Sequence, residues 1–285
     1  MFGRGGCGHA IVAGVMPVTT DWVSYGNYSG YLARPERVEI ALPGVVIIPE
    51  IWGVDEHIQD VTRRIAAAGY AAMAPDLYAK GGTRPEVLRA ERVSEVRAFM
   101  AGLALAVRTN PEAREAELAK LPQPAQSRVG ESYRALFAGL GHMDSHLPAL
   151  KAATHYLRQT CPSSRGQKVS CVGFCMGGGL TALLACEEPE LAGAAIFYGM
   201  SPPAERVPGI GCPVIGFYAG LDQRIGATLP AFAQAMAAAG KSFESHVYEG
   251  AAHSFFNDTG PAYDVRAARD SFARLLDFLR RTSSA

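Results

Sequence analysis

Residues 169–186 have the sequence VSCVGFCMGGGLTALLAC, and their hydrophobic pattern changes in the middle. The first part is β-branched and apolar, which is typical of a buried strand, and the last part predicts an apolar helix. Between them, Gly173-Phe174-Cys175-Met176-Gly177 places a nucleophile between two glycines, each two residues away. This pattern is typical of a sharp turn from strand to helix that exposes a catalytic nucleophile, with Cys175 here in the place of serine.

Steric crowding explains why glycines stand two residues before and two residues after Cys175. A side chain two residues before or after the nucleophile would collide with the neighbouring strand and helix, and Gly173 and Gly177 have none. The turn also places the sulfur at the amino end of a helix, where the helix dipole favours the thiolate over the thiol. A buried and inert cysteine is the alternative, and the surrounding sequence favours the reactive one.

Strands and helices alternate on both sides of this turn. The predicted strands are 21–25, 28–34, 44–49, 70–74, 168–174, 192–198, 213–219 and 243–248, and the predicted helices are 57–68, 147–157, 176–186, 229–239 and about 263–280. This alternation predicts an α/β fold, with a mostly parallel twisted sheet of about eight strands and helices on both faces. Gly26-Asn27 predicts a hairpin that adds antiparallel strands at one edge.

Residues 81–141 interrupt the alternation. They are rich in Arg, Glu and Ala, with prolines at 111, 122 and 124, and predict two or three helices inserted on top of the main fold. We expect this insertion to shape the entrance to the site, because long inserted segments usually carry specificity. Residues 18–285 are predicted to be a single α/β-hydrolase domain that includes this insertion, and residues 1–17 are expected to be a disordered or extended leader, with Met16 as an alternative start.

Composition excludes several function classes. The 285 residues are 48% hydrophobic and 19% charged, with 27 basic and 27 acidic side chains and a formal net charge of zero. That balance argues against a nucleic-acid or membrane-surface partner, and no apolar run is long enough to cross a bilayer. The six cysteines contain no C-x-x-C pair, which predicts reduced thiols and a cytoplasmic protein. His142 and His146 lack a third ligand, so we expect no metal.

Asp222 and His253 follow predicted strands as Cys175 does. Asp222 lies in the loop after 213–219, and His253 lies in the loop after 243–248. Open α/β sheets hold catalytic groups at the carboxyl ends of their strands, and the order nucleophile, acid, histidine is that of α/β-hydrolases. We therefore expect an α/β-hydrolase fold in which His253 takes the thiol proton and Asp222 holds the imidazole tautomer.

Glu50 stands at the end of a strand that is otherwise apolar. A carboxylate is costly to bury there unless it is paired, so Glu50 is either a paired site residue or a side chain that turns outward. The segment Ile51-Trp52-Gly53 that follows would supply one backbone N–H of an oxyanion hole, and Met176 would supply the other.

Four separated motifs carry a resemblance to a known family. They are Glu50-Ile51-Trp52-Gly53-Val54, Pro75-Asp76-Leu77-Tyr78, Gly173-Phe174-Cys175-Met176-Gly177-Gly178 and Gly250-Ala251-Ala252-His253-Ser254-Phe255. With these motifs in this order, the sequence resembles the dienelactone hydrolase family over about residues 18–279, apart from 81–141. The resemblance implies an α/β-hydrolase fold and a cofactor-free esterase with a triad of Cys175, His253 and Asp222.

The resemblance also implies roles for the other site residues. Ile51 and Met176 match the family's oxyanion amides. In the family, the glutamate that matches Glu50 contacts the resting thiol and moves when substrate arrives, so that a thiolate–imidazolium pair forms with His253.

The sequence differs from the family where the substrate carboxylate binds. Lactone-cleaving members have an arginine four residues after the histidine, and Asn257 stands at that position here. A second arginine and a tyrosine belong to the longer region, where the candidates are Arg84, Arg89, Arg92 and Tyr133. The candidate substrate-binding residues are therefore Trp52, Tyr78, Arg84, Tyr133 and Asn257.

The leading hypothesis is a hydrolase of the carboxymethylenebutenolidase type that cleaves an ester or lactone through a thioester acyl-enzyme, without cofactor or metal. Its expected partner is a small-molecule ester or lactone, and the oligomeric state is left open. A general carboxylesterase or thioesterase with the same triad is an alternative. A non-catalytic protein that uses Cys175 as a redox-sensing or binding thiol is an alternative of another class.

Overall fold

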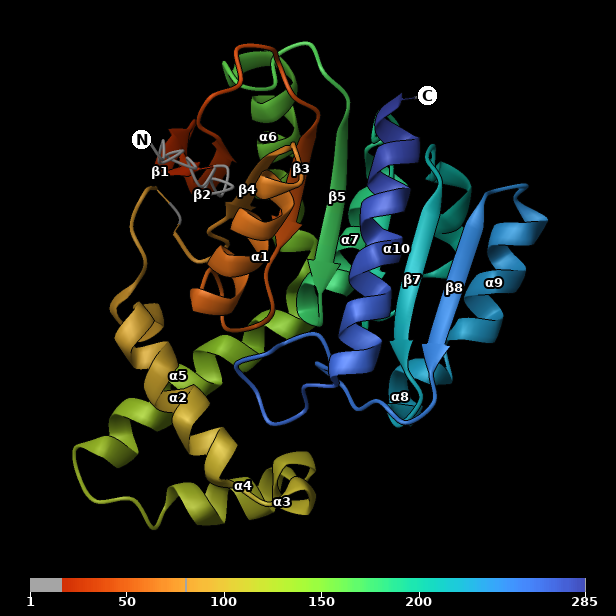
Figure 1. Ribbon diagram of the computed structural model, residues 1–285. Helices are drawn as coiled ribbons and strands as arrows, with labels where there is room; N and C mark the ends of the chain where they lie inside the picture. Colours follow the sequence, from red (N-terminus) through yellow and green to blue (C-terminus); the bar gives the residue numbers. More distant parts are fainter. Residues whose placement is uncertain (1–16, 80, 285) are drawn as a thin grey trace, which may run out of the picture.

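The computed structural model describes residues 17–79 and 81–284. Its strands are β1 Val18–Tyr25, β2 Tyr28–Pro35, β3 Gly44–Ile48, β4 Ala71–Pro75, β5 Val169–Phe174, β6 Ala194–Phe197, β7 Val214–Ala219 and β8 Phe243–Tyr248. They form one sheet in the order β1-β2-β4-β3-β5-β6-β7-β8 (Figure 1). β2 pairs antiparallel with β1 and β4, and the pairs from β4 to β8 are parallel. The predicted sheet and its edge hairpin are therefore confirmed.

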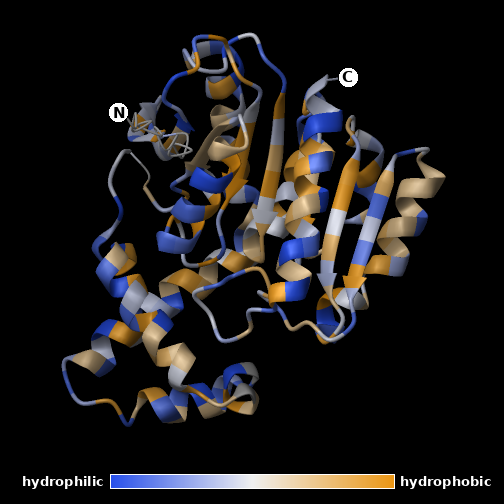
Figure 2. Ribbon diagram, viewed as in Figure 1, coloured by the Kyte–Doolittle hydropathy of each residue, from blue (hydrophilic) through white to orange (hydrophobic). Residues whose placement is uncertain are grey.

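The burial of each strand follows its place in the sheet. β3 and β5 lie in the middle and are buried along their whole length, so their sequences are nearly continuous runs of apolar residues. β8 lies at the edge, has no fully buried residue and mixes hydrophobic with hydrophilic side chains (Figure 2). Side chains of β3 alternate between two cores, with Val45 and Ile47 on one face and Val46 and Ile48 on the other.

Helices cover both faces of the sheet, and others form the insertion. The helices are α1 Glu56–Ala67, η1 Glu86–Leu88, α2 Ala90–Gly102, α3 Leu105–Thr109, α4 Pro111–Leu118, α5 Ala125–Ala138, η2 Gly139–His146, α6 Leu147–His155, η3 Tyr156–Thr160, α7 Met176–Glu187, η4 Ala204–Gly209, α8 Gln223–Gly226, α9 Leu229–Ala238 and α10 Val265–Ser284. α1 and α10 pack on one face, and α6 and α7 pack on the other (Figure 1). Across the described ranges, no helix combines the length and the apolar character that crossing a membrane requires.

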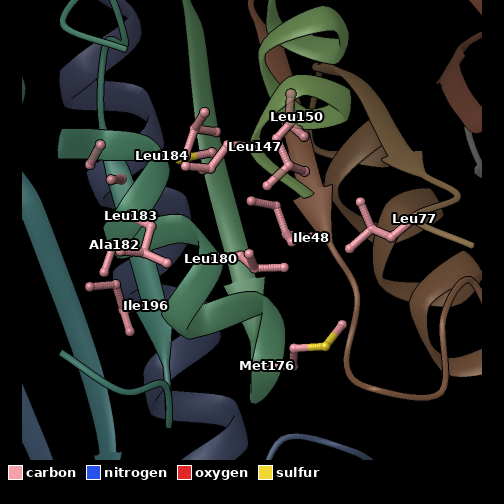
Figure 3. Packing of buried hydrophobic residues seen from close by; sticks show 14 of the residues in the cluster. Ile48, Leu77, Leu147, Leu150, Met176, Leu180, Ala182, Leu183, Leu184 and Ile196 are labelled. Atoms are coloured by element: carbon pink, nitrogen blue, oxygen red, sulfur yellow. The ribbon is translucent and has the colours of Figure 1, made fainter. Parts of the chain in front are cut away.

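The core under α6 and α7 fixes the end of β3. Leu147 and Leu150 of α6 and Leu180 of α7 lie around Ile48, the last residue of β3 (Figure 3). Met176, which begins α7, belongs to the same buried cluster. Burying a leucine or isoleucine side chain fully contributes about 1.5–3 kcal/mol, so the start of α7 is held firmly against the carboxyl end of β3.

The insertion differs in detail from its prediction. It holds four α-helices, which are α2, α3, α4 and α5, and the short 3-10 helix η1 between residues 81 and 141, where two or three helices were expected. Pro111, taken as a breaker, is the first residue of α4, where proline's missing N–H has no intrahelical partner to lose. Asn110 caps that helix by accepting the N–H of Ala113. The insertion lies on the side to which the strand arrows point (Figure 1).

The leader predicted for residues 1–17 lies almost wholly outside the described residues, as do Cys7 and Met16. The last predicted helix is longer than expected and continues to Ser284. The predicted helix 147–157 is also extended, because a π-helical turn follows α6 and runs to Thr160.

Candidate active site

The carboxyl edge of the sheet brings together residues that are far apart in the sequence. In the pairing of β3 with β5, Ile48 lies opposite Gly173. Glu50 and Cys175 each follow this last pair by two residues, so both lie just beyond the carboxyl ends of neighbouring strands. On the other side of β5, Phe174 pairs with Phe197 of β6, and Cys175 and Tyr198 follow directly. Tyr198 bonds Glu50 and interacts electrostatically with both Glu50 and Cys175, so the carboxylate, the phenol and the thiol lie near one another.

Cys175 lies where β5 ends and α7 begins, and its backbone is strained. Its φ of 55° and ψ of −114° lie in a region that residues with a Cβ rarely adopt. A Cβ at Gly173 would collide with the Gly177 carbonyl and the Thr181 hydroxyl, and a Cβ at Gly177 would collide with the Ile48 carbonyl. The steric requirement for two glycines, predicted from the sequence, is therefore confirmed.

Strained backbone is concentrated at this edge. Among residues 17–79 and 81–284, three non-glycine residues have a positive φ, and they are Cys175, Tyr198 with 38° and Ser254 with 67°. Ser254 follows His253 directly. Such conformations persist only where the surrounding structure imposes them, and they cluster at functional sites. Their positions support this edge as the candidate active site.

His253 is bonded to Asp222 and interacts with Cys175. Its Nδ1 lies 2.6 Å from Asp222 Oδ2, and its ring interacts electrostatically with Cys175. Burial lowers the pKa of His253, but the interactions with Cys175 and Asp222 more than offset it, and the pKa is raised to about 10. Burial raises the pKa of Asp222, and the bond to His253 reverses this and lowers it. The raised pKa of His253 favours its protonated form.

The Glu50 carboxylate is buried between two hydrogen-bond donors. Tyr198 donates its hydroxyl to Oε1 at 3.2 Å, and Asn257 donates from Nδ2 to Oε2 at 2.8 Å. Glu50 is only 2% exposed, so these donors replace the water that a buried carboxylate loses. Of the two alternatives for Glu50, the paired and buried one holds.

Tyr198 was not among the predicted site residues. Burial and the nearby charges of Glu50 and Cys175 raise its pKa well above the ordinary value, so its hydroxyl stays protonated and can donate. The ring also lies 5.1 Å from the ring of His253. Its place at the end of the strand predicted over 192–198 was a signal that could have found it.

The Asn257 side chain is buried and hydrogen-bonded to other residues of the protein. It is 3% exposed, and its Oδ1 accepts the Thr259 N–H at 3.1 Å and the Thr259 hydroxyl at 2.7 Å. Its Nδ2 is bonded to Glu50. With both ends of the amide occupied, this arrangement does not support the prediction that Asn257 binds substrate.

The segment after Glu50 is held by the motif Pro75-Asp76-Leu77-Tyr78. Tyr78 donates its hydroxyl to the Ile51 carbonyl at 2.7 Å, which orients the peptide that joins Ile51 to Trp52. The Tyr78 N–H in turn bonds Asp76 at 3.1 Å. Met176 begins α7, and the N–H groups in the first turn of a helix have no intrahelical partner. The assignment of the Ile51 and Met176 N–H groups to an oxyanion hole stays a prediction.

The Arg84 side chain contacts Asp76 and Tyr78 of the same motif. Its Nε lies 2.6 Å from Asp76 Oδ2, and its guanidinium lies 5.9 Å from the centre of the Tyr78 ring. Tyr78 and Arg84, both predicted to bind substrate, therefore contact the segment that holds Ile51. Arg92 is likewise occupied, because its guanidinium lies 3.0 Å from Glu131 within the insertion.

The remaining two candidates for substrate binding lie in different settings. Tyr133 stacks on Phe137 with ring centres 4.4 Å apart, and Arg114 lies over its ring at 5.6 Å. These contacts are all within the insertion. Trp52 is half-buried directly after Ile51 and packs against the core, and its role in substrate binding stays a prediction.

The described cysteines are all free, and Cys175 is the most accessible of them. It is half-buried, whereas Cys161, Cys171, Cys186 and Cys212 are buried. Burial raises the pKa of Cys171, Cys186 and Cys212, so these thiols stay protonated. Within the described part of the chain, no group of three or more His, Cys, Asp or Glu side chains is arranged to hold a metal ion.

Comparisons with known proteins were made for the whole chain. A model of the dienelactone hydrolase family matches residues 28–283. A protein of Saccharolobus solfataricus named "Putative carboxymethylenebutenolidase" is 36% identical over 255 residues, which are 89% of this chain and 93% of the relative. A relative of the same name from Escherichia coli strain K12 is 30% identical over 283 residues, which are 95% of this chain and 88% of the relative. A crystal structure named as that of a putative dienelactone hydrolase from Klebsiella pneumoniae has a TM-score of 0.62 at 27% identity, covering 93% of this chain and 99% of that one.

Proposed function

The chain belongs to the dienelactone hydrolase family and is a hydrolase that acts on esters or lactones, and we propose that Cys175, His253 and Asp222 form its catalytic triad. The observation that carries the proposal is the 2.6 Å bond between Asp222 and His253, together with the electrostatic interaction between His253 and Cys175. The strained backbone of Cys175 and its position at the amino end of α7 add to this support.

In the first half of the reaction the enzyme becomes acylated. The Cys175 thiolate attacks the carbonyl carbon, a C–S bond forms, and the carbonyl electron pair moves to oxygen. The N–H groups of Ile51 and Met176 stabilise this oxyanion. When the oxyanion collapses, the C–O bond to the leaving group breaks and the leaving oxygen takes a proton from His253. The product of this half is a thioester on Cys175.

In the second half, water releases the acid. His253, now neutral, removes a proton from water, which attacks the thioester carbonyl. The C–S bond breaks, the carboxylic acid leaves, and the thiolate–imidazolium pair forms again. Asp222 keeps a proton on Nδ1 throughout, so that the other ring nitrogen faces the reacting atoms. We assign Glu50 a role through its charge, since a carboxylate beside the sulfur opposes the thiolate unless the imidazolium is near.

Detection of the acyl-enzyme tests this mechanism directly. We expect p-nitrophenyl acetate to give a burst of p-nitrophenol equal to the enzyme concentration whenever deacylation is slower than acylation. Mass spectrometry of acid-quenched enzyme should then place one acetyl group on the peptide that contains Cys175. Acetylation of another residue, or turnover without any thioester under these conditions, would contradict the proposal.

The pH profile provides a second test. We expect kcat/KM to stay level on the neutral side and to fall as the pH passes about 10, because above that pH His253 loses the proton that the leaving group needs. The Asp222→Asn variant removes the carboxylate that helps to raise this pKa, so its alkaline limb should move to lower pH. Rates are measured after subtraction of spontaneous hydrolysis. A limb centred near the ordinary imidazole value of about 6.5 in the unaltered enzyme would be inconsistent with the ion pair.

A general carboxylesterase is a second candidate, and the position of Asn257 favours it. Asn257 stands where lactone-cleaving relatives have an arginine for the substrate carboxylate, and its amide is already bonded. Two other candidate arginines, Arg84 and Arg92, have carboxylate partners. A substrate carboxylate in this site would therefore gain little to offset its loss of water.

Matched esters separate the two candidates. We expect kcat/KM for neutral p-nitrophenyl acetate to exceed that for the anionic p-nitrophenyl hemisuccinate by about tenfold or more, since an unpaired polar group costs about 1–3 kcal/mol. Both esters release the same alcohol, so the comparison reports on the acyl side. A preference for the hemisuccinate would favour the lactone-type substrate instead.

We also propose that the insertion shapes the entrance to the site. Its position on the side to which the strands point supports this proposal.

A further inference from the structure

A row of hydrogen bonds runs from the insertion to Glu50. Arg97, on α2, donates from Nη2 to Thr259 Oγ1 at 2.5 Å. Thr259 Oγ1 lies 2.7 Å from Asn257 Oδ1, and Asn257 Nδ2 lies 2.8 Å from Glu50 Oε2. The row thus joins the insertion, the loop between β8 and α10 that holds His253, and the end of β3. In Figure 1 this loop lies between α10 and the insertion.

The chemistry of the side chains fixes the direction of each bond in this row. A guanidinium can only donate, so the Thr259 hydroxyl accepts from Arg97 and donates its own hydrogen bond to Asn257 Oδ1. Asn257 Oδ1 also accepts the Thr259 backbone N–H at 3.1 Å, so the amide oxygen faces Thr259 and the NH2 group faces Glu50. An ionised carboxylate can only accept, and Glu50 ends the row. One assignment of donors therefore satisfies all the bonds and leaves Asn257 a single orientation.

The outer end of the row is held by a second bond. Arg97 Nη1 donates to Asp55 Oδ2 at 2.7 Å, and Asp55 Oδ1 accepts the Ile58 N–H at the start of α1. The Arg97 and Asp55 side chains are 29% and 18% exposed, so water competes only in part for this charge-assisted bond. The same guanidinium therefore docks α2 against the body of the protein and holds Thr259.

We propose that Arg97, Thr259 and Asn257 are positioning residues that hold Glu50 in one place beside the Cys175 sulfur. The seating of the insertion then controls how reactive the thiol is, although none of these three side chains touches the reacting atoms. This inference rests on the proposed function, in which Cys175 is the nucleophile.

A physical argument gives the direction of the effect. Without the Asn257 donor, one Glu50 oxygen is buried without a partner, which is unfavourable. The carboxylate then gains by accepting the S–H of Cys175, which lies near Tyr198, the other partner of Glu50. A thiol that donates in this way is stabilised in its protonated form, and less thiolate is present. Weakening the row should therefore slow attack by the sulfur and leave substrate binding nearly unchanged.

Two substitutions at Thr259 test the row with little risk to the fold, because this side chain is exposed. Thr259→Val keeps the shape and removes the hydroxyl, and Thr259→Ser keeps the hydroxyl. We expect the valine variant to lose about fivefold in kcat with KM within about twofold, and the serine variant to retain the parent values. The rate at which iodoacetamide modifies Cys175 at pH 7.5, followed by peptide mass spectrometry, should fall in parallel for the valine variant alone.

A second pair of variants tests the origin of the effect in the insertion. Arg97→Met removes the donor of the row, whereas Arg128→Met removes an ion pair to Glu95 that lies within the insertion and outside the row. We expect only Arg97→Met to lower kcat and the modification rate, and Asn257→Ala to lower both the most, by about 10- to 100-fold. Circular dichroism of each variant separates these losses from unfolding.

The outcomes separate this inference from the proposed function. If the parent enzyme hydrolyses the ester and iodoacetamide stops it, but the valine and serine variants behave alike, the positioning role is wrong and the triad stands. Equal losses in Arg97→Met and Arg128→Met would point to general loosening of the insertion and would also overturn it. If labelling of Cys175 leaves the parent's turnover unchanged, the proposed function itself fails.

Discussion

Replacement of Cys175 by alanine is expected to lower kcat/KM for p-nitrophenyl acetate by at least about 10³-fold, because no other group at the site can form the thioester. His253 and Asp222 keep their bond in this variant and leave at most a general base that activates water. Cys175 is only half-buried, so alanine there should cost less packing than a substitution in the core. Initial rates at equal protein concentration, with circular dichroism as a check on folding, give the result.

The control for this substitution lies on the same helix. Cys186→Ala removes a buried thiol near the other end of α7 and is expected to leave kcat/KM within about twofold. Cys175→Ser would show how far oxygen can replace sulfur on the same turn. If alanine at position 175 hydrolysed the ester at the parent rate, another residue would be the nucleophile and the proposed mechanism would be wrong.

Gly177→Ala is expected to destabilise the protein by about 3 kcal/mol or more. The new Cβ would overlap the Ile48 carbonyl and lie 2.5 Å from the Pro49 carbonyl, and both are backbone atoms at the end of a central strand. Backbone in the middle of a parallel sheet cannot move aside without breaking its pairing, so α7 would have to shift and take Cys175 with it. Chemical denaturation followed by circular dichroism measures the change in the free energy of unfolding.

Gly102→Ala serves as the matched control. Gly102 ends α2, and a Cβ there would meet nothing within 4 Å. Its effect on the free energy of unfolding should stay within about 0.5 kcal/mol. Similar losses in the two variants would mean that close packing between α7 and β3 is not what requires glycine at position 177.

The central sheet could be predicted because its strands are buried on both faces. GVVII in β3 and VSCVGF in β5 are nearly continuous apolar runs. Runs of this length are typical of strands that are buried on both faces of a parallel sheet. The helices of the insertion were harder to predict. α3 has 5 residues and α4 has 8, and helices this short do not show a clear helical repeat of hydrophobic residues. Their boundaries depend on caps such as Asn110, which resemble ordinary loop residues in the sequence.

The residues of the candidate site that directly follow strands could be predicted from the sequence. Cys175, Asp222 and His253 each follow a strand, and parallel strands bring their carboxyl ends to one edge, so their meeting follows from topology. The partners of Glu50 do not follow from topology in this way. The bond from Asn257 to Glu50 joins positions 207 residues apart, and it depends on how one loop folds over the edge.

The same limit explains the predictions for Tyr78 and Arg84. Their residue types suit substrate binding, and their place after β4 puts them near the site. Whether a phenol or guanidinium reaches substrate or supports a neighbouring segment depends on side-chain directions that hydrophobic patterns do not contain. Here the Ile51 carbonyl and Asp76 take their polar groups.

The uneven burial of the cysteines has a practical consequence. In a Cys7→Ser background, a maleimide dye should attach almost entirely at one place, since four of the five described thiols are buried and three of them are held protonated. The moles of dye bound per mole of chain would then count the competent enzyme molecules in a preparation. Fluorescence from that single position would also report when a ligand occupies the neighbouring space, without any substrate being consumed.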